Sequence, residues 1–96
     1  MAVRFIREMQ LSAAEFMRQV PSAVAPLTAR ISDDQVIIPD GDNRVTITLI
    51  EEEVKHLGSL DLPMQQVAFE FAGYSEQEME QFMKTFDERT LRAGAL

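Results

Sequence analysis

The sequence has no cysteine and no tryptophan, and its 96 residues include a single histidine and a single tyrosine. The lack of cysteine excludes disulfide bonds, thiolate metal sites and thiol nucleophiles. Uninterrupted apolar runs are only a few residues long, which predicts that the chain does not span a membrane. Arg4, Arg7 and Glu8 interrupt the segment where a signal peptide needs its apolar run. These absences predict a cytoplasmic protein with no membrane partner.

The chain is acidic, with a formal net charge of −7, and phosphate backbones would repel it. Its nine basic residues are scattered and form no basic stripe, so we expect no nucleic-acid partner. Hydrophobic residues make up 46% and charged residues 26% of the chain, which is typical of a globular domain. The length predicts one domain over residues 1–90, followed by a C-terminal tail at residues 91–96 that frays.

Two Ser-x-x-Glu motifs predict the starts of two helices, at Ser12–Glu15 and Ser75–Glu78. In such a capping box the serine hydroxyl accepts from the glutamate N–H, and the glutamate side chain accepts from the serine N–H. Pro21 is expected to end or kink the first helix because it lacks an N–H donor. Helical spacing of i, i+3, i+4 and i+7 relates the large apolar residues of the second helix, which are Met79, Phe82, Met83 and Phe86.

Alternating apolar and polar residues predict strands at 44–50 and 66–72, and weaker patterns predict strands at 3–9, 27–31 and 35–38. Residues 39–43 predict a turn, and residues 58–63 a connection. Residues 51–58 fit either an extension of the preceding strand or a helical turn, and the strand is favoured. The order is therefore β-α-β-β-β-β-α, an α+β fold. We expect an antiparallel sheet of four to five strands with both helices on one face.

Three segments carry a resemblance to other proteins: GSLDLP at 58–63, VAFEFAGYSEQE at 67–78 and FMKTFDER at 82–89. Together they resemble a group of small uncharacterised bacterial proteins that end in an amphipathic helix. This resemblance implies no activity and no site residues. The predicted element order also resembles one half of the TATA-binding-protein fold, and a likeness at the level of fold implies nothing about DNA.

The only candidates for acid–base chemistry are His56, the preceding glutamates and Tyr74, and Tyr74 is more simply explained as a staple residue before the second helix. Glu52 and His56 would share one face of a strand, or would be neighbours on a helical turn. A carboxylate beside an imidazole raises its basicity. A solvated charge cluster at a strand end is the favoured interpretation. We expect neither a metal nor a cofactor, because a calcium loop starting at Asp40 would need glycine where Val45 stands.

The large apolar residues of the two helices are the candidate interaction surface. Filling the core is their ordinary role, but methionine also lines adaptable binding surfaces. Part of this face could remain open, because two short helices carry more bulk than one sheet face covers. The favoured function is an acidic module that binds a protein partner or forms a homodimer. The alternatives are a carrier of a small apolar ligand and, least favoured, a small enzyme using Glu52 and His56. The surface candidates are Phe16, Met17, Met79, Phe82, Met83 and Phe86.

Overall fold

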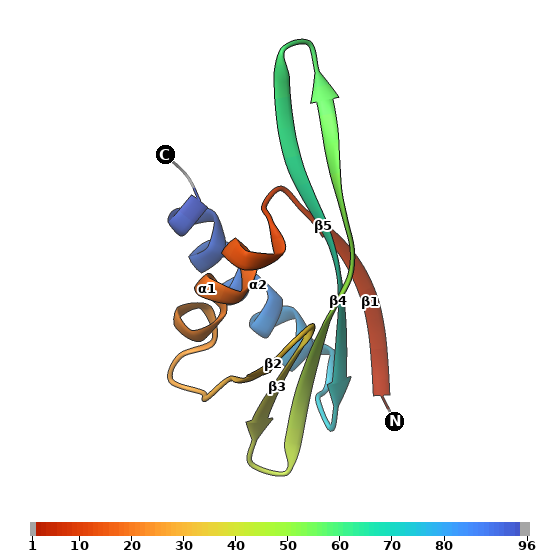
Figure 1. The fold of residues 1–96 in the computed structure, drawn as a ribbon. Coiled ribbons are helices and arrows are strands. Elements are labelled where there is room, and N and C mark those ends of the chain that lie inside the picture. Colours follow the sequence, from red (N-terminus) through yellow and green to blue (C-terminus); the bar gives the residue numbers. More distant parts are fainter. Residues whose placement is uncertain (1, 95–96) are drawn as a thin grey trace.

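The structure is a computed structural model that describes residues 2–94. Its elements follow one another in the predicted order, and the α+β class is confirmed (Figure 1). The elements are β1 (Ala2–Met9), α1 (Ala13–Val24), β2 (Arg30–Ser32), β3 (Gln35–Asp40), β4 (Asn43–Leu57), β5 (Leu60–Ala72) and α2 (Glu76–Gly94).

The five strands form one antiparallel sheet in the order β1-β5-β4-β3-β2, and both helices lie on the same side of it (Figure 1). A two-residue turn joins each strand to the next from β2 through β5. Gly41 and Gly58 each take the first turn position with φ of +62°, the conformation that a type II′ hairpin turn requires there. The chain therefore runs as a meander from β2 back to β5, which pairs with β1.

Several predicted boundaries were wrong. The strand expected at residues 27–31 begins only at Arg30, and Pro21 does not end α1, which continues to Val24. Residues 51–57 are strand, as favoured. The connection expected at residues 58–63 is only the turn Gly58–Ser59, because β5 begins at Leu60. The α2 helix extends to Gly94, residues 95–96 lie outside the described residues, and the predicted fraying of the tail stays a prediction.

The two predicted helix caps differ in detail. At α2 the box is reciprocal: the Ser75 N–H donates to Glu78 Oε1 at 2.8 Å, and the Glu78 N–H donates to Ser75 Oγ at 3.1 Å. These bonds, first that from the Ser75 backbone, hold the pKa of Glu78 below its ordinary value. At α1 Ser12 Oγ accepts from the Glu15 N–H at 3.1 Å, but the Glu15 carboxylate accepts from Arg18 and Gln19 instead. Only the second motif therefore forms the complete capping box.

An aromatic cluster joins the sheet to both helices. Phe69 of β5 is fully buried; it stacks on Phe5 of β1 with ring centroids 6.1 Å apart and meets Phe86 of α2 edge-on at 5.3 Å. Phe86 in turn lies 5.9 Å from Phe16 of α1. The opposite face of the sheet carries exposed residues such as Ile6, which is 56% exposed. The apolar layer therefore lies between the helices and one face of the sheet.

Truncating the centre of this cluster tests the layer directly. We expect Phe69→Ala to lower the free energy of unfolding by about 3–5 kcal/mol, because it removes a fully buried ring and leaves a cavity. The matched control is Ile6→Ala, on the other face of the sheet. This variant should change the free energy of unfolding by only about 0.5 kcal/mol. Urea denaturation followed by circular dichroism measures both. Equal losses for the two variants would contradict a core on one face only.

Candidate interaction surface

The structure places most of the predicted helix surface in the core. Phe16, Met83 and Phe86 are buried, whereas Met17, Met79 and Phe82 are partly buried and pack against the core from its margin. Phe82 stacks on Phe86 with centroids 6.2 Å apart. The helix face therefore presents no continuous open apolar stripe, and its remaining exposure is confined to its edges.

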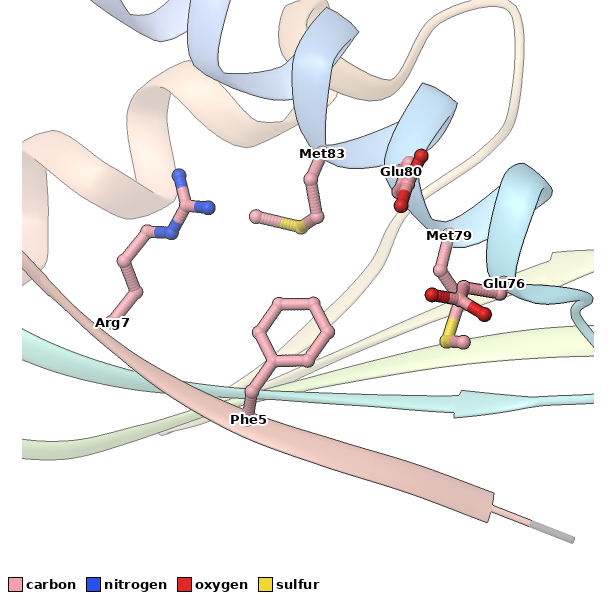
Figure 2. Close-up of a pocket in the computed structure, with 6 residues that line it drawn as sticks. All are labelled: Phe5, Arg7, Glu76, Met79, Glu80 and Met83. Atoms are coloured by element: carbon pink, nitrogen blue, oxygen red, sulfur yellow. The ribbon is translucent and has the colours of Figure 1, made fainter.

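An open pocket of about 290 Å³ lies between β1 and the start of α2 (Figure 2). Phe5, Met79 and Met83 supply its apolar lining, and Arg7 and the exposed Glu76 and Glu80 supply charged groups. The Arg7 guanidinium also forms an ion pair with Asp87 further along α2. Charged side chains therefore make up half of the residues around this pocket, which is unlike the mostly apolar cavity that holds an apolar ligand.

Glu52 and His56 lie on the same strand but do not converge. The Glu52 carboxylate accepts from the Ala13 N–H at 3.0 Å, at the first residue of α1. The His56 Nδ1 lies 2.6 Å from Asp61 Oδ1 on β5, and both side chains are exposed. Four residues along a strand span about 13 Å, so the two predicted partners are too far apart to act together. Among the residues that the structure describes, no group of acidic or histidine residues has the arrangement of a metal site.

The tyrosine, too, has a structural partner. The Tyr74 hydroxyl donates to Asp40 Oδ2 at 2.7 Å, and its ring packs edge-on against Phe71 at 5.3 Å. Burial, and then the hydrogen bond to Asp40, raises the pKa of Tyr74 above its ordinary value. This side chain therefore stays protonated and ties the start of α2 to the end of β3.

The largest uncovered feature is the far half of the β4–β5 hairpin. On one side β3 pairs with β4 only as far as Gln35 opposite Thr48, and on the other β1 pairs with β5 only as far as Met9 opposite Gln65. Beyond these pairs β4 and β5 continue alone to their turn, and they project from the rest of the molecule (Figure 1). We call this two-stranded segment, residues 50–64, the arm. The molecule is accordingly elongated, with extents of 47 × 25 × 24 Å.

A bulge marks the base of the arm. The register of β4 against β5 shifts between Leu49 and Glu51, so Ile50 is an extra residue on β4. Gln65, which is buried, pairs with Glu52 just beyond the bulge. Its Nε2 donates to the Glu51 carbonyl at 3.1 Å and to the Gln66 carbonyl at 2.8 Å. The bulge reverses which β4 side chains face the helices, and this reversal brings Glu52 to the N-terminus of α1.

The arm carries large apolar side chains that the described part of the chain, residues 2–94, leaves about half exposed. Ile50 is 44% exposed, Val54 52%, Leu57 58% and Leu60 61%. Leu57 and Leu60 face each other beside the turn, and Leu62 and Met64 continue along the same face of β5. On the other face Val54 lies opposite Pro63. An isolated two-stranded ribbon is only marginally stable in water, and such exposed apolar groups are typical of a contact surface.

Sequence patterns alone missed this surface. Gly58 and Pro63 favour a connection, and the three consecutive glutamates 51–53 give no alternation that marks a strand. The available signal was the Gly-Ser pair between two leucines, which is typical of a tight hairpin turn. Whether the hairpin would project beyond its neighbours depended on the lengths of β1 and β3, which the hairpin's own sequence does not encode.

No family model, curated protein or solved structure matches this chain. The resemblance to small bacterial proteins therefore stays a prediction. Within residues 2–94, no helix is both long enough and apolar enough to cross a membrane.

We expect the arm to be dispensable for folding. Deleting residues 54–57 and 60–63 leaves Glu53 and Met64, which already face each other, flanking the Gly58–Ser59 turn. Removing four residues from each strand preserves which side chains face which side. The lost Lys55–Glu8 ion pair, 3.1 Å long, is exposed, so the free energy of unfolding should fall by about 1 kcal/mol or less in urea titrations. Loss of the cooperative unfolding transition would show that the arm belongs to the core.

Proposed function

We propose that this chain is a protein-interaction module that makes contact through its arm, residues 50–64. The observation that carries this proposal is the run of exposed apolar side chains on two strands that extend beyond all their neighbours. Residues 51–60 are all exposed, although apolar residues and strand edges are the groups that proteins ordinarily cover. A partner that packs on the arm would remove the apolar side chains from water, and one that extends its sheet would pair the strand edge.

The arm is also held in a defined direction, which a contact element needs. Lys55 reaches Glu8 of β1, Glu52 accepts from the start of α1, and Gln65 fixes the bulge. The contacts of Glu52 and Gln65 lie at the base of the arm, whereas Lys55 reaches β1 from further along it, opposite Leu62. Ordering the arm before binding reduces the conformational entropy that a partner must otherwise remove.

The proposal moves the contact surface away from the helix residues that the sequence favoured. Three of those six residues are buried, and the others lie at the margin of the core. A ligand carrier receives less support from an open pocket in which half of the lining residues are charged. An enzyme receives less support from Glu52 and His56, since each is engaged by a different partner.

Site-specific photo-crosslinking tests this proposal. A benzophenone amino acid replaces Leu60 at the arm tip, and a control variant carries it at Gln77, an exposed residue near the start of α2. We expect irradiation of the purified protein, or of cells that express it, to give defined adducts from position 60 and none from position 77. Mass spectrometry identifies the adduct, and binding of the purified partner is then measured with the complete and the arm-deleted chain.

Two results would contradict the proposal. One is an absence of position-specific adducts at Leu60. The other is a partner that binds the arm-deleted chain as tightly as the complete one. A second copy of the chain and a different protein would each support it as the crosslinked partner.

A further inference from the structure

The β4 side of the arm is a free sheet edge. Residues 50–57 have β5 on one side. On the other side β3 ends at Gln35, opposite Thr48, and the last backbone bond is from the Leu49 N–H to the carbonyl of Asp34 in the β2–β3 turn, at 2.8 Å. Beyond Leu49 the outward N–H and C=O groups of β4 have no strand partner among the described residues. Such an edge is a template on which another strand can form a ladder.

The β5 edge of the arm is less suited to the addition of a strand. Its free stretch, residues 60–64, contains Pro63, which has no N–H to donate. Proline within a strand is confined to positions where the missing donor faces away from the ladder, so the gap lies on the outer edge of β5. The β4 edge has no proline between residues 50 and 58. Addition of a strand is therefore favoured on β4.

We infer that the occupant of this edge is a second copy of the chain. The two β4 edges pair antiparallel around a two-fold axis at Val54, and together the two arms form a four-stranded sheet. This inference rests on the proposed function and names its partner. Pairing the two edges gives each β4 a ladder on both of its sides, which a separate two-stranded arm lacks.

Charge selects this register. Centred on Val54, Glu53 of each copy faces Lys55 of the other. Opposite charges directly across a ladder are favourable, and like charges are unfavourable. If the two β4 strands were instead paired around Glu53, the two copies of Glu53 would lie opposite each other. If they were paired around Lys55, the two copies of Lys55 would do so. Slips that pair odd with even positions are excluded, because they would set side chains from opposite faces against each other.

The geometry leaves room for both molecules. In this register Ile50 faces Gly58 of the second copy, so the ladder ends where β3 begins to cover β4. The ladder covers residues 50–58 of each copy, so the two bodies lie at its opposite ends, nine residues or roughly 27 Å of strand apart.

Charge-reversal variants test the register. Glu53→Lys alone sets lysines opposite lysines, and Lys55→Glu alone sets glutamates opposite glutamates, so each should dimerise at least about tenfold more weakly than the natural chain. Mixing the two variants restores both opposite-charge pairs, and a heterodimer should form with close to natural affinity. Sedimentation equilibrium measures each dissociation constant, and the differences should shrink as salt is added.

The control pair is Glu80→Lys and Lys84→Glu on α2, which makes the same changes in net charge on exposed residues away from the arm. Both should dimerise as the natural chain does. A natural chain that remains a monomer overturns the second-copy inference, whereas the proposed function then stands if Leu60 crosslinks to another protein. A dimer that is insensitive to the arm variants, or single variants that mixing does not rescue, also overturns the inference.

Discussion

The difference in strand length is the constraint on which the rest of this structure depends. β4 has 15 residues and β5 has 13, whereas β1 has eight and β3 has six. The two long strands form the centre of the sheet, where neighbours on both sides and helices on one face cover them. Both strands then extend beyond the ends of β1 and β3, so the same backbone pairing that builds the core also produces the arm. The body and the arm are two ends of one hairpin in different surroundings.

Those surroundings decide what each apolar residue does. Val45 and Ile47 of β4 are fully buried beneath the helices, and Val54, further along the same strand, is half exposed. Between them the bulge at Ile50 reverses the side chains, and Gln65 satisfies carbonyl groups at that point. Apolar side chains on a strand segment that neither helix covers contribute little burial to the stability of the fold.

Local chemistry was sufficient to predict much of the fold. The helix start at Ser75, the buried strand residues around Ile47 and the order of the elements all follow from spacing and capping. The arm did not follow, because alternation indicates a strand only when one face is covered, and Glu51 to Glu53 lack it. Core filling was the ordinary expectation for Met83 and Phe86, but whether part of their helix face stays open depends on how much sheet lies beneath α2. In each case the local sequence lacked information about which distant segments pack against these residues.

Amide hydrogen exchange, measured residue by residue by NMR in dilute and concentrated solution, tests the central claim most directly. If the unpaired edge of β4 is the site of association, the amides of residues 50–57 that point away from β5 should become protected as concentration rises. The amides that already bond to β5, and those of Val45 and Ile47, should exchange alike in both solutions. Exchange along the arm that does not change with concentration would contradict the claim.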